Sequence, residues 1–403
     1  MHFFRILLVL VAGAIVAGAT AQADSGNTQG ITDTTIKIGS LGPFSGESSV
    51  FDPLNYGPDA YLRYINAQGG VHGRKFVTVF ADGSCNEAKG IAAAKKLIYE
   101  DKVFMIMGSP CSGVSMAIKP MLVKEGVPWI GISANPKLTT PVVPGMFHTT
   151  YTGVQSGHAM ASFALSKPGV TKIALVEHSN DWAHGYCDPA TDYIKQHGGT
   201  IVATTVMERG STDATTQALQ IKASGAQGVM GCLYQQELVI FLRAMQTYRV
   251  DAFTVGALGA DFEQTVRDVG DPAAVRGKFF QPYQFKAKLG EGPLKKFHDI
   301  FVKYLTRSEL PKQGEPTNFY YFGVPAAIVT VEAFRLAGPH PTRESWEAAI
   351  ESLKNFDTGV LADTETFSHD NHVGVERMYA VGLDKNGNEV VYKSWDQPID
   401  GGS

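Results

Sequence analysis

The sequence predicts an α/β protein made of two doubly wound, Rossmann-like units, each a mostly parallel sheet with helices on both faces. Short apolar strands alternate with amphipathic helices from Thr35 onward, and the same alternation restarts after Tyr151. Regular alternation of strand and helix is typical of parallel sheets, because parallel strands need a long crossover that a helix supplies. The 403 residues of the chain also exceed the usual length of a single domain.

The first unit opens with a strand at 36–39, which ends in a loop rich in Gly, Pro and Ser at 42–49. A helix at 56–67 is stopped by Gly69 and Gly70. Alternating apolar residues predict the next strand, and short buried apolar runs predict the later ones. The remaining elements are strands at 75–80, 103–107 and 128–132 and helices at 87–100 and 112–124.

The second unit repeats this order. Its predicted helices are 155–165, 188–197, 215–223 and 236–247, and its predicted strands are 172–177, 200–207, 228–232 and 252–256. Two further helices are expected at 293–305 and 321–337. A loop at 369–374 precedes a hairpin of 378–381 with 389–393, because Asn386-Gly387 is a strong two-residue turn.

The first 23 residues have the pattern of a secretory signal peptide. Arg5 precedes an apolar run at 6–19, and Ala21-Gln22-Ala23 places small residues where a signal peptidase cuts. The apolar run is short for a membrane span, which leaves an uncleaved anchor as the alternative. We therefore predict export, with a mature chain that begins near Asp24 and carries no lipid anchor, since no Cys follows the run.

The charge balance excludes two classes of partner. The chain has 35 Lys and Arg against 39 Asp and Glu, a formal charge of −4, and it has no basic block. Nucleic acids and anionic membrane surfaces attract basic patches, so neither is expected as a partner.

The four cysteines are Cys85, Cys111, Cys187 and Cys232. In an exported protein, we expect these cysteines to form disulfides in preference to binding a metal or acting as redox centres. Four cysteines allow three pairings, and spacing does not choose among them.

Enzyme and metal motifs are missing. The sequence contains no GxSxG elbow, Walker A loop, HExxH motif or GxGxxG turn after a strand. His369 and His372 share one polar loop, but no further ligands lie at useful spacing, so no metal is predicted. We predict no catalytic residue and no cofactor; a hydrolase using Ser112 and His184 is the enzyme alternative.

Several runs occur along the chain in a recognisable order: GPFSG at 42–46, INAQGGVHGR at 65–74, DGSCN at 82–86, GSPCS at 108–112 and SANPKLT at 133–139, followed by the segments 147–155, 180–185, 231–237 and 256–259. In this order they resemble the type I periplasmic binding proteins, specifically the leucine/isoleucine/valine-binding family of ABC importers.

This resemblance implies two lobes joined by three crossovers, with the ligand between them. Lobe one would hold residues 31–150 and 281–357, and lobe two residues 151–280 and 358–403. It also implies a periplasmic, monomeric protein that closes on a small molecule and presents it to ABC permease subunits in the inner membrane. A signalling receptor is the alternative partner.

The resemblance further implies a disulfide between Cys85 and Cys111, because family members carry a bridge at the matching positions. Cys187 and Cys232 then remain in one lobe for a second bridge.

The same resemblance places a ligand carboxylate in lobe one, at Ser112 and at the stretch of Ser133 and Ala134. A helix expected to start near Gly113 would aim its free N–H groups at this anion. Ser112 could instead serve only as the helix N-cap. Ala134 stands where the family usually has Thr, which removes one hydrogen-bond donor.

Leu258 is the more informative departure from the family. Amino-acid-binding members place an acid at the matching position, where it pairs with the ligand ammonium. An ammonium buried beside leucine without a carboxylate would cost several kcal/mol. Asp261 could swing in to replace that acid. We therefore predict a carboxylate ligand that lacks an α-amino group; a branched-chain or other amino acid is the alternative.

Aromatic residues gather at the same strand ends and crossovers. Phe51, Tyr151, Trp182 and Tyr234 are expected to face the cleft, and His184 matches a tyrosine that contacts ligand in the family. Flat aromatic walls favour a flat ligand through offset stacking. Phe51 and Trp182 could equally pack in the lobe cores. The preferred ligand is thus an aromatic or other non-amino carboxylate.

Overall fold

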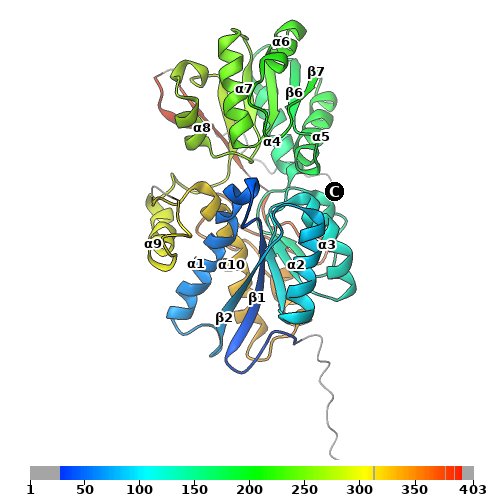
Figure 1. The fold of residues 1–403 in the computed structure, drawn as a ribbon, viewed down its shortest axis with the longest axis vertical. Helices are drawn as coiled ribbons and strands as arrows, with labels where there is room; N and C mark the ends of the chain where they lie inside the picture. The colour runs from blue at the N-terminus through cyan, green and yellow to red at the C-terminus, as the bar shows by residue number, and fades with distance from the viewer. Residues whose placement is uncertain (1–27, 312–313, 377, 385, 393–403) are drawn as a thin grey trace, which may run out of the picture.

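The structure is a computed structural model that describes residues 28–311, 314–376, 378–384 and 386–392. The chain forms two lobes, each built on its own sheet (Figure 1). This confirms the predicted α/β class with two doubly wound units. The predicted signal peptide, residues 1–23, lies outside the described residues.

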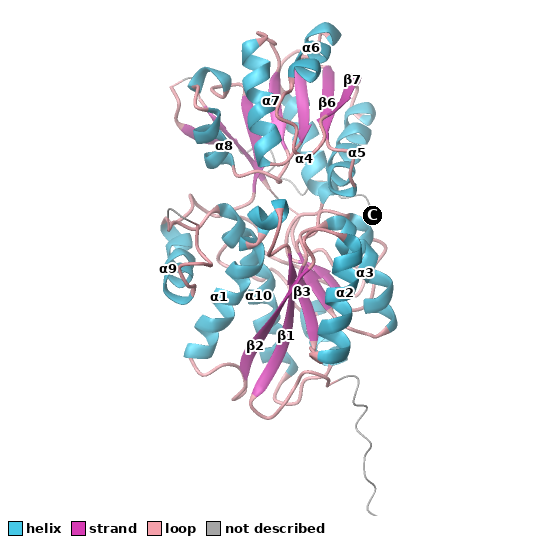
Figure 2. Cartoon of the chain, viewed as in Figure 1, coloured by secondary structure: helices cyan, strands magenta, loops and turns pink. Residues whose placement is uncertain are grey.

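The first sheet is wholly parallel, with strand order β2-β1-β3-β4-β5. Helices cover both of its faces, α1 and α10 on one side and α2 and α3 on the other (Figure 2). The strands are β1 (Thr35–Gly42), β2 (Lys75–Asp82), β3 (Met105–Gly108), β4 (Trp129–Gly131) and β5 (Met146–His148). The helices of this lobe are α1 (Pro53–Ala67), α2 (Glu87–Lys95), α3 (Ser112–Lys124), α9 (Lys295–Tyr304), α10 (Asn318–Ala337) and α11 (Arg343–Glu351).

The second sheet has the order β12-β11-β10-β9-β8-β6-β7, and its strand pairs are parallel except for β10 with β11 and β11 with β12, which are antiparallel. The strands β11 and β12 form the predicted antiparallel hairpin. The strands are β6 (Lys172–Glu177), β7 (Thr200–Val206), β8 (Gly228–Cys232), β9 (Phe253–Gly256), β10 (Phe279–Tyr283), β11 (Tyr379–Leu383) and β12 (Glu389–Tyr392). The helices are α4 (Gly153–Ser166), α5 (Asp181–Gln196), α6 (Thr215–Ser224), α7 (Gln235–Thr247) and α8 (Phe262–Val269).

The chain passes between the sheets three times: after β5, after β10 and before β11. The second and third passages pair with each other through a bridge of Phe285 with Leu361. The third also runs beside β5, where His148 pairs with Val373. Both boundaries differ from the predicted ranges, since β10 extends to Tyr283 in the second sheet and the segment 365–375 stays beside the first.

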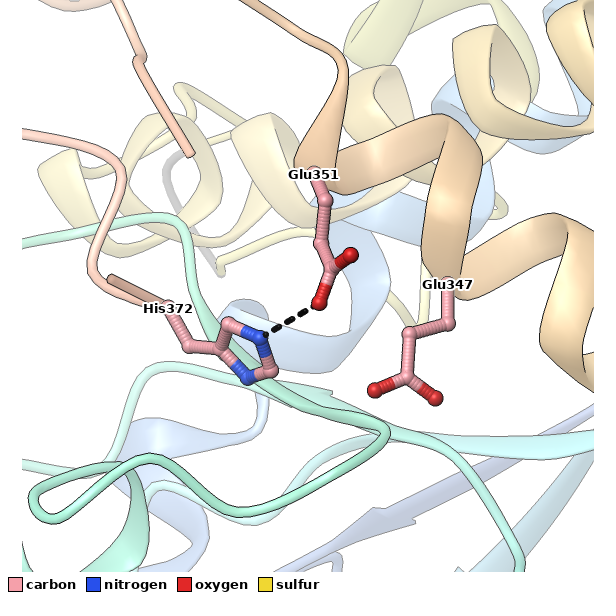
Figure 3. Close-up of side chains that lie close together, drawn as sticks. All are labelled: Glu347, Glu351 and His372. Carbon is pink, nitrogen blue, oxygen red and sulfur yellow. Dashed lines mark hydrogen bonds and ion pairs between the residues drawn. The ribbon is translucent and has the colours of Figure 1, made fainter. Parts of the chain in front are cut away.

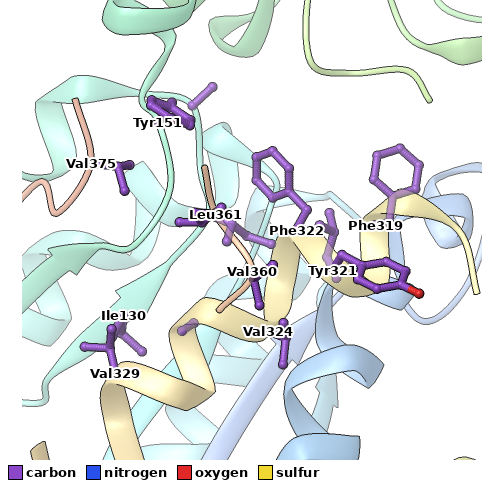
Figure 4. Close-up of a cluster of buried hydrophobic side chains, with 14 of the residues drawn as sticks. Ile130, Tyr151, Phe319, Tyr321, Phe322, Val324, Val329, Val360, Leu361 and Val375 are labelled. Atoms are coloured by element: carbon purple, nitrogen blue, oxygen red, sulfur yellow. The ribbon is translucent and has the colours of Figure 1, made fainter. Parts of the chain in front are cut away.

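Two glycines allow α1 and α10 to pack directly against each other. A Cβ atom on Gly57 would lie 2.2 Å from the Tyr320 carbonyl oxygen, and one on Gly323 would lie 2.2 Å from the Leu54 carbonyl oxygen. Glycine at both positions therefore permits backbone contact. Where α10 meets the crossovers, its apolar residues join a buried cluster with side chains from distant parts of the chain (Figure 4).

None of the helices in the described part of the chain combines the length and the apolar character needed to cross a membrane.

Candidate functional site: the interlobe cleft

An apolar cavity lies between the lobes, with about 470 Å³ of space that is partly open to solvent. Four of the predicted ligand contacts line it: Phe51, Trp182, Tyr234 and Leu258. Among the described residues of its wall, none carries a charge. The remaining wall residues are Leu54, Cys85, Pro110, Cys111, Ile132, Tyr186, Gly259, Phe319 and Phe322.

Aromatic rings in the wall of this cavity pack against one another, one pair tilted and two edge to face. The ring centroids of Trp182 and Tyr234 lie 4.4 Å apart with 35° between the planes, and Phe51 meets Tyr234 at 5.3 Å and 63°. Phe51 also meets Phe319 at 5.4 Å and 71°. A Cβ atom on Gly259 would lie 2.4 Å from the Trp182 ring, so the loop after β9 must carry glycine to let this ring lie flat on it.

The position of Tyr234 is fixed by a buried histidine behind it. The Tyr234 backbone N–H donates to His178 Nε2 at 3.0 Å, and His178 Nδ1 donates to the Met207 carbonyl at 2.6 Å. Burial lowers the pKa of His178, which keeps the ring neutral so that Nε2 can accept. Burial also raises the pKa of Tyr234 to about 12, so its hydroxyl stays protonated and can donate to a ligand.

Arg209 reaches across the cleft from lobe two. Its guanidinium lies 5.2 Å from the Tyr234 ring centroid, and Nη2 donates to Ser48 Oγ of lobe one at 3.2 Å. Sequence reasoning gave Arg209 no role, because it lies in the loop between β7 and α6 with no motif around it.

Ser112 and Ser133 form a polar pair at the start of α3. Ser133 Oγ donates to Ser112 Oγ at 3.1 Å, and both side chains are buried. Cys111 is the N-cap of α3 and makes no side-chain capping bond. Ser112 is therefore the first helical residue, which makes the N-cap alternative wrong. The first N–H groups of this helix remain available to an anion next to the wall residue Cys111.

His148 supports this polar pair from behind. Its Nε2 donates to the Ser133 carbonyl at 2.8 Å, and its Nδ1 accepts from Thr139 Oγ1 at 2.8 Å. Complete burial lowers its pKa to about 4, so the ring is neutral and this pattern of one donor and one acceptor holds at neutral pH.

Five predicted contacts do not line the apolar cavity: the buried pair of Ser112 and Ser133 described above, and Ala134, Tyr151 and His184. Ala134 is buried, and its carbonyl accepts from Gly153 N–H at 2.7 Å where the first crossover enters lobe two. Tyr151 is buried in the crossover cluster (Figure 4). His184 lies on the exposed side of α5, with Nδ1 3.8 Å from Asp188 Oδ1. Because α5 starts already at Asp181, helical geometry separates His184 from Trp182 and turns it outward.

A second cavity, of about 450 Å³, lies beside the first and shares Leu258 and Phe322 with it. Asp261 lines this second cavity. Its carboxylate caps α8, accepting from Gln264 N–H at 2.7 Å, and also accepts from Asn318 N–H at 3.2 Å. These two bonds hold Asp261 in place, and they oppose the idea that it swings into the apolar cavity.

Both expected disulfides are present, Cys85 with Cys111 and Cys187 with Cys232. The first bridge ties the loop after β2 to the start of α3, and both of its cysteines line the apolar cavity.

Sequence reasoning missed the contribution of α10 to the cleft. Phe319 and Phe322 line the apolar cavity from the first turns of α10, which begins at Asn318 instead of the predicted 321. The run Phe319-Tyr320-Tyr321-Phe322 was the available signal, because four consecutive aromatics at a helix start exceed what one buried face needs.

Comparisons with known proteins agree with this architecture. Residues 35–388 match the family described as periplasmic binding protein. A curated relative from Brucella suis, described as Leu/Ile/Val-binding protein homolog 7, is 25% identical over 328 residues, which cover 78% of this chain and 79% of the relative.

Two solved structures share the fold. A branched-chain amino acid ABC transporter from Thermus thermophilus with bound valine superposes with a TM-score of 0.80 at 20% identity, covering 91% of this chain and 97% of the other. A solute-binding protein of an ABC transporter from R. palustris, in complex with 4-hydroxybenzoate, gives a TM-score of 0.75 at 21% identity, covering 89% and 95%. The chain belongs to the type I periplasmic binding proteins of the Leu/Ile/Val-binding family, which are solute-binding components of ABC transporters and not enzymes.

Proposed function

We propose that this solute-binding protein carries a small apolar carboxylate without an α-ammonium group, with aromatic acids as the preferred class. The single observation that carries the proposal is the composition of the cleft wall. Leu258 lies in the apolar cavity, and none of the described wall residues is an acid. Residues 1–23, read as a signal peptide, support action in the periplasm.

The ammonium group of an amino acid would find no acidic partner among the described wall residues of this cavity. An ammonium that leaves water needs a carboxylate or several hydrogen-bond acceptors, and a buried charge without them costs several kcal/mol. Leu258, Trp182 and Phe322 offer neither. A carboxylate, in contrast, can use the free N–H groups at the start of α3, which follows the wall residue Cys111; the hydroxyls of Ser112 and Ser133 lie buried at this helix start.

Aromatic acids are preferred because the wall offers flat rings from both lobes. Phe51 and Phe319 come from lobe one, and Trp182 and Tyr234 come from lobe two. Each contact between an aromatic ligand ring and a wall ring contributes about 1 kcal/mol to binding, beyond the contribution of the apolar area that is buried. The R. palustris protein in complex with 4-hydroxybenzoate supports this class as a ligand of the fold.

A branched-chain amino acid is the second candidate. The relatives favour it, because they include a Leu/Ile/Val-binding protein homolog and a structure with bound valine. The chain would then need an acid for the ammonium, and Asp261 is the nearest candidate in sequence to Leu258. Its two backbone partners, Gln264 and Asn318, would have to release it.

The transport step follows from the two-lobe geometry. A ligand that contacts Trp182 of one lobe and Phe51 of the other favours the closed state by its differential contacts. The structure also has a direct hydrogen bond between the lobes, from Arg209 to Ser48. A permease that recognises the closed form would then bind the ligand-loaded protein. A membrane sensor is the alternative partner, and co-purification with a permease or with a sensor distinguishes the two.

The test is a thermal-shift panel on refolded, ligand-free mature protein. Ligands that bind only the folded state raise the melting temperature by mass action. We expect benzoate and 4-hydroxybenzoate to raise it and leucine, valine and glutamate to leave it unchanged. A rise with leucine or valine alone would overturn the proposed ligand class and favour the second candidate.

A further inference from the structure

A group of metal-ligating side chains lies outside the cleft, beside β5 of lobe one. Glu347 and Glu351 project from α11, and His372 projects from the third crossover toward them (Figure 3). One ligand atom from each of the three lies within 4.8 Å of the other two. We propose that Glu347, Glu351 and His372 form a zinc site that ties the third crossover to lobe one.

The two glutamates share one face of α11, because residues four apart in a helix lie one turn above each other. The helix itself is fixed by a capping box at Thr342 and by Trp346 and Ile350, which are completely buried. Its glutamate-bearing side is therefore held toward the crossover.

The orientation of His372 is set by the backbone around it. Its Nδ1 lies 2.9 Å from the Met146 carbonyl and 3.1 Å from the Val143 carbonyl, and its ring stacks on Phe147 at 4.1 Å. Two carbonyl acceptors at Nδ1 require a proton there, so Nε2 is the nitrogen left to bind a metal. A metal-bound histidine usually donates its other N–H in this way.

Nε2 of His372 lies 3.2 Å from Glu351 Oε1. This matches the spacing of about 3.3 Å between two ligand atoms on a tetrahedral zinc with bonds of ~2.0–2.2 Å. Glu347 uses Oε1 to accept from Gly145 N–H at 2.7 Å, which leaves its second oxygen for a metal. His369 Nδ1 lies 3.5 Å from Glu351 Oε1 on an exposed side chain, and it is available as a fourth ligand.

The donor set favours zinc among the common divalent ions. Magnesium and calcium prefer oxygen ligands alone, whereas imidazole with carboxylates suits zinc. A proton on Nε2 could also join His372 to Glu351, but a single proton bridges His372 to only one of the two carboxylates. One divalent ion satisfies all three side chains, which is why we place zinc here.

The experiment uses the mature chain without a histidine tag, stripped with EDTA and dialysed. Isothermal titration with zinc chloride measures stoichiometry and affinity, with magnesium and calcium chloride as comparison ions. The double variant Glu347→Gln/Glu351→Gln removes two ligands while it keeps their size. Glu344→Gln is the matched control, because Glu344 lies on the same helix, is exposed and belongs outside the group.

We expect one zinc per chain in the wild type and in Glu344→Gln, no binding of magnesium or calcium, and an affinity at least 10-fold weaker in the double variant. Zinc should also raise the melting temperature of the wild type and of Glu344→Gln, and it should leave that of the double variant unchanged. Glu351→Gln alone serves the same comparison if the double variant does not fold. The absence of zinc binding by the wild type, or equal binding by the ligand variants, overturns the proposal.

Discussion

The two cavities that meet at Leu258 and Phe322 differ in charge. The apolar cavity has no charged residue among its described wall residues, whereas its neighbour has Asp261, Glu263 and Glu389. The neighbour also holds Gln281 and Gln284, both buried, with side-chain oxygens that lack a hydrogen-bond partner.

Under the proposed function, Leu258 is the side chain that determines the ligand class. Leu258 faces both cavities and keeps the acidic residues on one side of itself. A ligand in the apolar cavity would contact aromatic rings and lie near the N-terminus of α3. A cationic group in this cavity would find no acidic residue among the described wall residues.

Leu258→Glu should weaken binding of an aromatic acid at least about 1,000-fold, or ~4 kcal/mol, because it buries a second anion beside the ligand. The same change should admit leucine, whose ammonium gains a partner. Titration calorimetry of both ligands measures the two effects. Leu258→Gln controls for shape and polarity without charge. Unchanged affinity for every ligand in Leu258→Glu would show that this residue does not face the ligand.

The two disulfides should differ in their effect on binding but not greatly in their effect on stability. Replacing Cys187 and Cys232 by alanine should lower the free energy of unfolding by about 4 kcal/mol, and replacing Cys85 and Cys111 by about 3.5 kcal/mol, given separations of 45 and 26 residues. Only the second pair of changes should weaken ligand binding, because only those cysteines line the apolar cavity. Denaturant unfolding and ligand titration check this; equal loss of affinity in both variants would contradict it.

His148 should make stability depend on pH. Its pKa is about 4 in the folded state, and burial is the main cause, against about 6.5 in an unfolded chain. The unfolded state therefore binds more protons between these values, and the free energy of unfolding falls by up to about 3 kcal/mol as the pH drops from 6.5 to 4. Urea unfolding of the wild type and of His148→Gln across this pH range measures the contribution of His148, as the difference between their free energies of unfolding.

The difference between variants is needed because Asp52 acts with the opposite sign. Burial raises its pKa to about 6, so the folded state binds the extra proton and gains stability as the pH falls through that value. Wild-type stability alone would show the two terms partly cancelled. A pH profile of His148→Gln parallel to that of the wild type would contradict the assignment to His148.

Asp261→Ala should cost about 1 kcal/mol of stability through loss of the side-chain cap on α8 and should leave ligand affinity unchanged. Thermal unfolding and ligand titration measure both. A tenfold loss of amino-acid affinity would instead show that Asp261 faces the ligand, and the separation of the two cavities would fail.

Much of the fold was predictable because its signals are local. The strands β6 and β8 and the helix α3 match the predicted bounds, since each is a distinct apolar or amphipathic run. The strand β10 was missed because it contains Pro282, which cannot donate a hydrogen bond and argues against a central strand. The first turns of α5 were missed because Pro189 resembles a helix start, although Asn180 caps the helix earlier by accepting from Ala183 N–H.

The cleft was only partly predictable, for a different physical reason. Residues after strands, such as Trp182, Tyr234 and Leu258, are placed by the rule that parallel strands end at one edge. Phe319 and Phe322 come from a helix that returns to lobe one, and no local pattern shows which turn faces the ligand. The same holds for Glu347 and Glu351, which meet His372 only through the path of the third crossover.

The most direct measurement of the central claim compares ligands that differ only in the α-ammonium group. Titration calorimetry on refolded wild-type protein would compare 3-phenylpropionate with phenylalanine, and 4-methylpentanoate with leucine. The account predicts that the acid without nitrogen binds more tightly in each pair, because the cleft offers no acid for the ammonium. Tighter binding of phenylalanine and leucine would contradict it.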